Sequence, residues 1–342
     1  MTEPRRTRTR RRTVSQETGK AVSSSLRANR HALPRVVFVV GPTSSGKTAI
    51  ALRLAKALNG EVINADARQV YRGLTIGTGK PLHGKRKRIG KQTVYMVDGI
   101  PHHLMDVIPP EHPYSVAEWR EGALEAIRSI VRRKKLPIVA GGTGLYTSSL
   151  IDNYQFPNVE AQPFLRASLD SKSLEELVQV LLAADPDSAN IVDLKNKRRV
   201  IRALEVVTFS GKKFSEARGK AEPLVDAYQV GLWREQEDLY ARTEAAIDRM
   251  FGEGLVGEVR TLLRKGVPPD ATSMSSIGYS DVARHLRGEI SLNDTIALMK
   301  GRTRQYTKRQ ITWFKRDKRI HWVKTENDAV KKVTRWVKGS NV

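Results

Sequence analysis

One segment constrains this chain more than any other: Gly41-Pro42-Thr43-Ser44-Ser45-Gly46-Lys47-Thr48. It follows the apolar residues 36–40 and precedes the amphipathic residues 49–55, so it joins a predicted strand to a predicted helix. This is the context that the pattern G-x-x-x-x-G-K-[ST] requires, because glycines let backbone N–H groups point at a phosphate and the helix N-terminus adds positive charge. In such a loop the lysine reaches the terminal phosphates and the final hydroxyl ligates Mg²⁺. The segment, called the phosphate loop below, therefore predicts binding of a di- or triphosphate with magnesium on Thr48.

The composition excludes several classes of protein. The 342 residues include no cysteine, which excludes disulfides, thiolate catalysis and zinc–sulfur sites and fits a reducing cytoplasm. No run of 18 apolar residues could span a membrane, and the N-terminus lacks the apolar segment of a secretory signal. The net charge is +24, of which the first 35 residues carry +8, so the body itself is strongly basic. Such a charge favours a polyanionic partner, nucleic acid first and an anionic membrane surface second.

Apolar strands alternate with amphipathic helices along the chain. This order predicts an α/β fold, a P-loop NTPase-like parallel sheet flanked by helices, with a helical insertion. Residues 1–34 have no hydrophobic period and are predicted to form a disordered basic tail, either with affinity for nucleic acid or without a role. We assign residues 35–150 to the first part of the core, 151–194 to the helical insertion, and 195–342 to the completion of the core with basic C-terminal helices.

A carboxylate ends the second predicted strand. Residues 61–65 lead directly into Asp66, and the carboxyl ends of parallel strands line the ligand crevice of such sheets. We therefore expect Asp66 beside the phosphate loop. Kinases and ATPases usually hold magnesium through an acid at the end of a core strand, but residues 136–140 end in two glycines. Asp98 follows a lysine-rich stretch unlike a central strand, so a kinase or ATPase is the alternative and not the preferred interpretation.

Two further features have a structural and a functional interpretation. Residues 82–97 predict an inserted hairpin whose basic run at 85–91 is explained equally by solvation and by contact with nucleic acid. His102 and His103 suggest a metal site, but the sequence has no cysteine and no third ligand at metal-binding spacing. Loop packing or hydrogen bonding is therefore the preferred role of these two histidines.

Eight blocks of the sequence occur in an order that resembles a known family. They are residues 41–48, 66–71, 76–81, 101–106, 141–146, 199–206, 277–279 and 303–314. Together they resemble the tRNA dimethylallyltransferases, also called the IPP transferase family, over about 36–323. The resemblance implies transfer of a dimethylallyl group from dimethylallyl diphosphate to the exocyclic N6 amine of the adenosine at tRNA position 37, next to the anticodon. It also implies a Mg²⁺ requirement and an insertion that grips the anticodon arm.

The resemblance also implies catalytic roles. Asp66 is the expected general base, Thr143 contacts the reacting base, and Arg242 lies near the diphosphate. A diphosphate leaving group fits the phosphate loop without ATP, because Lys47, the loop amides and magnesium on Thr48 can stabilise the departing charge. The alternatives are an Asp66 that caps a helix or orients magnesium ligands, a plain turn threonine, and a solvated arginine on a helix.

An adenine in a stacked loop must leave the stack to reach a catalytic pocket, so basic and aromatic side chains should hold the RNA around it. The predicted tRNA contacts are Asp66, Ala67, Arg68, Gln69, Arg198, Arg199, Val200, Ile201, Arg202, Lys308, Arg309, Gln310 and Trp313. A solvated basic helix is the alternative for the last four, although a tryptophan is unusual on such a face. The chain departs from the family at Ala67, where serine is usual, and at Gly79, where alanine is usual. The serine hydroxyl would have supplied one tRNA contact.

Two alternatives from other classes share some of these motifs. An isopentenyltransferase acting on free adenine nucleotides would need neither the basic body nor the insertion helices. A non-catalytic RNA-binding module with a degenerate loop would not need the intact Lys47, Thr48 and Asp66. We therefore expect a monomeric enzyme whose partners are tRNA and dimethylallyl diphosphate and which does not bind a membrane.

Overall fold

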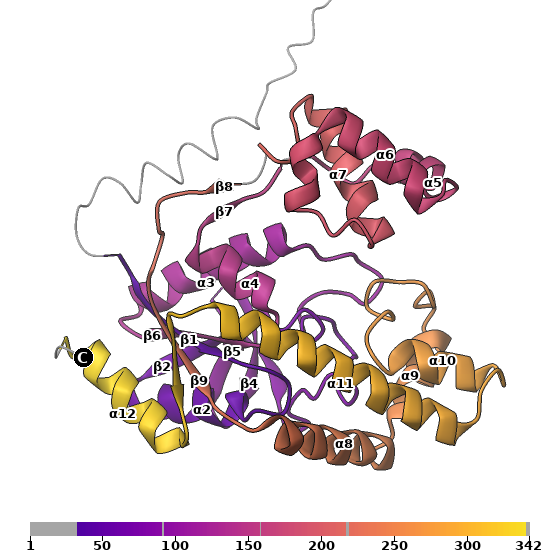
Figure 1. Ribbon diagram of the computed structural model, residues 1–342. Helices are drawn as coiled ribbons and strands as arrows, with labels where there is room; N and C mark the ends of the chain where they lie inside the picture. The colour runs from indigo at the N-terminus through magenta and orange to yellow at the C-terminus, as the bar shows by residue number, and fades with distance from the viewer. Residues whose placement is uncertain (1–32, 91, 158, 217–218, 340–342) are drawn as a thin grey trace, which may run out of the picture. The chain divides into compact units, whose positions relative to one another are not determined.

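A large sheet organises the computed structural model, which describes residues 33–90, 92–157, 159–216 and 219–339 (Figure 1). Its eight strands lie in the order β10-β9-β1-β6-β2-β5-β4-β3. Their bounds are β1 Arg35–Val40, β2 Gly60–Asn64, β3 Lys85–Ile89, β4 Gln92–Val97, β5 Ile100–His103, β6 Leu136–Gly141, β9 Asp226–Leu232 and β10 Ile320–Val323. The first six strands in that order are parallel, β4 runs antiparallel to them, and β3 pairs antiparallel with β4. The predicted α/β fold with a parallel sheet is confirmed.

The central strand β1 is buried on both faces, which explains its unbroken apolar sequence. On one face its residues pack against α3 (Val116–Arg132), α4 (Gly144–Ile151) and the end of α11 (Leu292–Arg316). On the other face they pack against α2 (Lys47–Ala57) and α12 (Glu326–Val337). Helix α3 begins at the predicted capping box, in which Ser115 and Glu118 satisfy each other's backbone N–H groups.

A second group of helices packs on the loops that follow β2. It consists of α8 (Gln236–Gly252), α9 (Leu255–Arg264), α10 (Tyr279–Leu286) and the first half of α11. Their apolar side chains enclose Val70, Tyr71 and Leu74. This packing fixes the segment that carries Asp66 at one end and residues 76–80 at the other.

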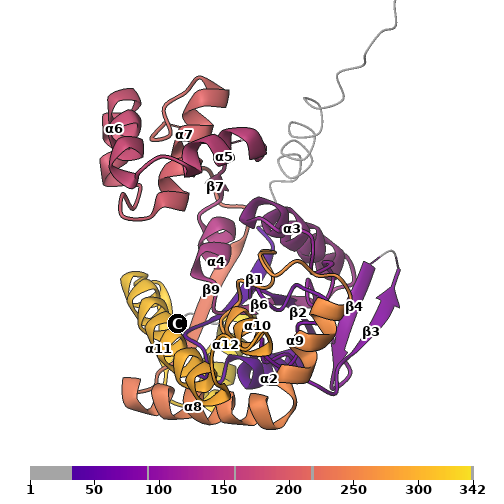
Figure 2. The same cartoon turned by 90° about the vertical axis from the view of Figure 1, so that its right-hand side faces the viewer.

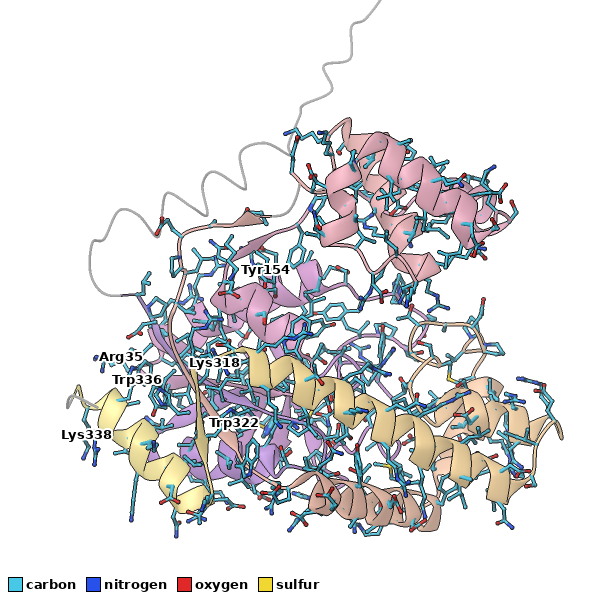
Figure 3. All side chains as sticks on the ribbon, viewed as in Figure 1. Arg35, Tyr154, Lys318, Trp322, Trp336 and Lys338 are labelled. Atoms are coloured by element: carbon cyan, nitrogen blue, oxygen red, sulfur yellow. The ribbon has the colours of Figure 1, made fainter. Side chains whose placement is uncertain are left out.

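Arg35, the first residue of β1, contacts the C-terminal helix α12. Its guanidinium donates to the backbone oxygen of Val337 at 2.6 Å and lies over the ring of Trp336, 5.5 Å from its centroid (Figure 3). Helix α12 is thereby held against the start of β1.

The β3–β4 hairpin forms the free edge of the sheet (Figure 2). It corresponds to the hairpin predicted for residues 82–97. We expected His102 and His103 in a loop. They lie in strand β5, because residues 100–103 pair with both β2 and β4. His103 Nε2 lies 2.7 Å from the buried carboxylate of Glu61, so hydrogen bonding is its observed role. Within the described ranges no group of three or more histidine, cysteine or acidic residues could hold a metal ion.

The helical insertion enters and leaves through a short antiparallel pair, β7 (Tyr154–Gln155) and β8 (Gly219–Lys220). Between them lie α5 (Pro163–Asp170), α6 (Leu174–Ala184), a 3₁₀ turn at Pro186–Asn190 and α7 (Lys197–Ser210). Leu177 and Leu181 of α6 form one apolar cluster with residues of α7. The structure therefore places α7 in the insertion, whereas the sequence-based boundary at 194/195 assigned it to the core.

The predicted disordered tail at 1–34 falls almost wholly outside the described residues. In the described part of the chain no helix is both long enough and apolar enough to cross a membrane.

Candidate active site

A cavity of about 760 Å³ opens at the carboxyl ends of β2 and β6, beside the phosphate loop that follows β1. The phosphate loop lines it through Thr43, Ser44, Lys47 and Thr48. The segments 66–69 and 76–80, α8, residues 275–277 and α11 form the remaining walls. This is where ligands bind in open α/β sheets, because side chains and loops from several parallel strands converge there.

The phosphate loop has the curled backbone that anion binding needs. Gly46, with φ of 100°, precedes α2, and Ser44 also lies in the left-handed region with φ of 62°. Lys47 Nζ donates to the backbone oxygen of Pro42 at 2.5 Å, so the lysine folds over the loop. Burial lowers the pKa of Lys47 to about 8, and the nearby charge of Asp66 opposes this shift. Lys47 and Asp66 therefore interact electrostatically, and both line the same cavity.

Asp66 is oriented by the backbone that follows it. Its Oδ1 accepts hydrogen bonds from the N–H groups of Arg68 at 2.8 Å and Gln69 at 3.3 Å. Asn64 holds the same turn from the other side, because its amide nitrogen donates to the backbone oxygen of Asp66 at 3.1 Å and to that of Leu104 at 3.0 Å. For Oδ2 of Asp66 the described residues provide no hydrogen-bond donor. One carboxylate oxygen is thus fixed while the residue lines the cavity.

In the turn Gly141-Gly142-Thr143-Gly144, glycine is needed at position 141 because the backbone of a neighbouring strand end lies very close to it. A Cβ atom on Gly141 would lie 2.1 Å from the backbone oxygen of Ala65. Thr143 Oγ1 accepts a hydrogen bond from the N–H of Ala67 at 3.0 Å. The backbone of Ala67 makes this contact, so the change from the family's serine does not affect it.

Helix α11 joins the two glycine-containing loops through Gln310. The side-chain oxygen of Gln310 accepts from the backbone N–H of Thr43 at 2.9 Å, and its amide nitrogen donates to the backbone oxygen of Gly142 at 2.8 Å. Gln310 is only 5% exposed, so its side chain braces the site, and the predicted tRNA contact at this residue stays a prediction. The same helix contributes Tyr306 and Arg309 to the cavity wall.

Tyr306 and Trp313 add aromatic surface on the same helix. Burial and the charge of Asp66 raise the pKa of Tyr306 to about 12, against the interaction with Thr143 that lowers it, so its hydroxyl stays protonated at neutral pH. The guanidinium of Arg309 lies 5.8 Å from the centroid of the Tyr306 ring. Trp313 is 42% exposed and packs against Gly144, where a Cβ would meet its ring at 2.2 Å.

Comparison with known proteins identifies the family. A family model described as IPP transferase matches residues 69–317. The chain belongs to the IPP transferase family. A tRNA dimethylallyltransferase of Pelotomaculum thermopropionicum is 40% identical over 299 residues, covering 86% of this chain and 92% of that protein. One of Geobacter metallireducens is 42% identical over 296 residues, with coverage of 84% and 92%. The predicted family is confirmed.

Solved structures of the IPP transferase family share the fold. The tRNA isopentenylpyrophosphate transferase of Bacillus halodurans is 33% identical with a TM-score of 0.64, covering 90% of this chain and 96% of that one. A eukaryotic dimethylallyltransferase acting on tRNA is 28% identical with a TM-score of 0.74, covering 90% of this chain and 80% of that one.

The predicted catalytic Arg242 does not line the cavity of this IPP transferase. It lies half-exposed on α8, where its Nε donates to Asp238 at 2.8 Å. Asp238 also pairs with Arg234 at 3.2 Å, and Arg234 Nε donates to the backbone oxygen of Ser45 at 3.0 Å. Arg242 therefore reaches the phosphate loop only through two other side chains. Sequence reasoning missed Arg234, since its contact lies 189 positions away along the chain.

The predicted tRNA contacts in the insertion of this IPP transferase differ in how exposed they are. Arg198 and Arg199 are exposed on α7. Val200 and Ile201 are buried in the insertion core, so their side chains are covered in this structure, and the predicted tRNA contact at these two positions stays a prediction. Arg202 forms an ion pair with the fully buried Glu205 and is only partly free to meet RNA.

Two ionic residues near the cavity, the buried Lys80 and the partly buried Glu258, were also not predicted from the sequence. Lys80 lines the cavity and donates to Asp106 Oδ1 at 2.6 Å, while Glu258 accepts hydrogen bonds from the N–H groups of Thr75 at 3.0 Å and Ile76 at 2.8 Å. Lys80 falls within the family block at 76–81, which was a usable signal. Glu258 had no such signal, because the two backbone N–H groups that it accepts from lie more than 180 positions earlier.

Proposed function

We propose that this protein transfers a dimethylallyl group from dimethylallyl diphosphate to the N6 amine of the adenosine at tRNA position 37. Membership of the IPP transferase family supports the reaction class. The observation that carries the chemistry is that Lys47 and Asp66 line one cavity, so a diphosphate and the atom attacking its ester carbon can be held together. A second polyanion, the RNA, suits the net charge of +24.

The proposed step forms one bond and breaks another. The N6 amine attacks C1 of the dimethylallyl group while the C1–O bond to diphosphate breaks. Asp66 takes the proton that the amine loses, through the oxygen that the backbone leaves free. Lys47 and the loop amides stabilise the negative charge that builds on the departing diphosphate. The apolar side chains Ile247 and Met299 in the cavity wall suit the hydrocarbon part of the donor.

Magnesium fits this donor set. Thr48 offers a hydroxyl at the start of α2 and lines the cavity, and Mg²⁺ commonly combines few protein ligands with substrate phosphates and water. We propose that Thr48 and the diphosphate hold the ion, which would supply Lewis-acid stabilisation of the leaving group.

The arrangement of acids argues against a kinase or ATPase. β6, next to β1, ends in Gly141-Gly142, and Asp98 follows β4, which runs antiparallel to β5. The end of β4 therefore lies at the edge of the sheet opposite the phosphate loop. There Asp98 pairs with His83 at 3.1 Å.

The proposal is tested by incubating the purified protein with magnesium, unmodified tRNA and labelled dimethylallyl diphosphate. Label should enter the tRNA and release diphosphate. Asp66→Asn should lower the single-turnover rate by about 10²–10⁴-fold with tRNA affinity kept, because base catalysis is lost. Asp98→Asn is the matched control and should keep the wild-type rate. Label that enters adenosine monophosphate but not tRNA, or ATP hydrolysis without transfer, would contradict the proposal.

A further inference from the structure

The free edge of the sheet carries a row of basic side chains. Lys85, Arg86, Lys87 and Arg88 occupy consecutive positions of β3, and all are exposed. Arg86 approaches one carboxylate, that of Asp106, at 3.7 Å. Nowhere in the described ranges does a carboxylate lie within ion-pair distance of the other three, which are called the basic edge below. Three uncompensated charges on one short strand produce a strong local positive potential.

The register of the sheet places the basic edge close to the catalytic side. Residues facing one another across the four outer strands are Arg86, Tyr95, His102 and Val62. Because two antiparallel pairings separate β3 from β5, and β5 is parallel to β2, β3 runs in the same direction as β2. Arg88 therefore lies at the level of Asn64, the last residue of β2. Three strand spacings of about 4.8 Å put it roughly 14 Å from that strand end.

Side-chain contacts tie the hairpin to the cavity as well. Asp106, the partner of Arg86, also holds Lys80, and Lys80 lines the cavity. Leu82, at the base of the hairpin, is 53% exposed and belongs to the same wall. The basic edge therefore continues the rim of the cavity outward along the sheet.

We propose that Lys85, Lys87 and Arg88 bind the phosphate backbone of the tRNA whose adenosine occupies the cavity. The inference rests on the proposed function. Such contacts are electrostatic and independent of sequence, and they fix the position of an RNA without reading its bases. Charged side chains on an edge strand also prevent that strand from pairing with a strand of another chain. That role would not require the charges to lie beside the rim of the cavity, where they are found.

The test compares two variants with the same loss of charge. The first is Lys85→Gln/Lys87→Gln/Arg88→Gln, which spares Arg86 and its link to the cavity. The control is Lys331→Gln/Lys332→Gln/Lys338→Gln, on exposed positions of α12 and just after it; α12 packs on α2 and β9, away from β3 in the strand order. Affinity for unmodified tRNA is measured from about 50 to 200 mM salt, the range over which phosphate contacts lose most of their strength.

The basic-edge variant should bind tRNA about 10- to 100-fold more weakly at the lowest salt, and its plot of log K against log salt should be shallower by about 2 to 3. Its KM for tRNA should rise in parallel, while its KM for dimethylallyl diphosphate stays at the wild-type value. The control should match the wild type in affinity and slope.

Three results would overturn the inference: wild-type affinity and slope in the basic-edge variant, an equal loss in both variants, or self-association of the variant with unchanged RNA binding. The last result would assign the charges to protection of the edge alone. If the wild type transfers no label to tRNA, the proposed function fails. If it does transfer label and the basic-edge variant binds normally, only this inference fails.

Discussion

Gln310 connects α11 to both loops of the site, so its replacement tests how the site is built. Gln310→Met nearly keeps the side-chain volume but loses the hydrogen bonds to Thr43 N–H, Thr43 Oγ1 and the oxygen of Gly142. A buried carbonyl left without a donor costs about 1–3 kcal/mol, and the half-buried N–H costs about 0.5–1.5 kcal/mol. We therefore expect a loss of about 2–4 kcal/mol of unfolding free energy and a Tm lower by about 4–8 °C.

The same variant should bind the diphosphate donor less well, because the N–H of Thr43 is no longer held by α11. If the less ordered loop weakens donor binding by about 1 kcal/mol, the KM for the donor rises roughly fivefold. Gln305→Met, an exposed position on the same helix, is the matched control and should change neither quantity. Thermal melts and initial rates measure both. If Gln310→Met melts and turns over like the control, the bracing role of Gln310 is refuted.

Three further outcomes follow from the structure. Burial lowers the pKa of Lys47 to about 8, so kcat/KM for the diphosphate donor should fall as pH rises through about 8. This decline should vanish in Lys47→Arg, because arginine stays protonated. A decline with the same midpoint in Lys47→Arg would show that another group causes it. Burial would raise the pKa of Glu205, but hydrogen bonds from two arginines outweigh it and lower the pKa to about 2. The ionised Glu205 therefore contributes its full stabilisation of the folded state above pH 4.5 and loses it as the pH falls toward 2. In acid unfolding followed by circular dichroism, Glu205→Gln should lack this part of the pH dependence. Gly141→Ala should unfold or inactivate the protein, because its Cβ meets the backbone oxygen of Ala65, whereas Gly301→Ala, with nothing within 4 Å, should be tolerated; equal melting temperatures would contradict this.

Local patterns explain which features the sequence predicted. The phosphate loop, the capping boxes and the hairpin each depend on residues a few positions apart, so the order of residue types is sufficient. The burial of Val200 and Ile201 was not anticipated, because a contiguous family block was treated as one surface. A helix turns successive residues to different sides, and these two apolar residues belong to its buried face.

Other features depend on residues that are distant in the sequence and carry no local signal. Gln310 and Thr43 each lie in a family block, but they meet across 267 positions and neither block indicates that the two residues are in contact. The outer limit of the insertion depends on the pairing of Tyr154 with Lys220, two residues in strands of only two residues each. Strands this short have no periodicity from which a boundary could be predicted.

The pairing of Tyr154 with Lys220 also brings the entry and exit of the intervening segment to neighbouring positions. A segment whose two ends are adjacent can change in length or sequence without altering the registration of the strands that flank it. The segment also has an apolar core of its own. This module can therefore vary by substitution, extension or exchange while the sheet that carries the cavity keeps its geometry.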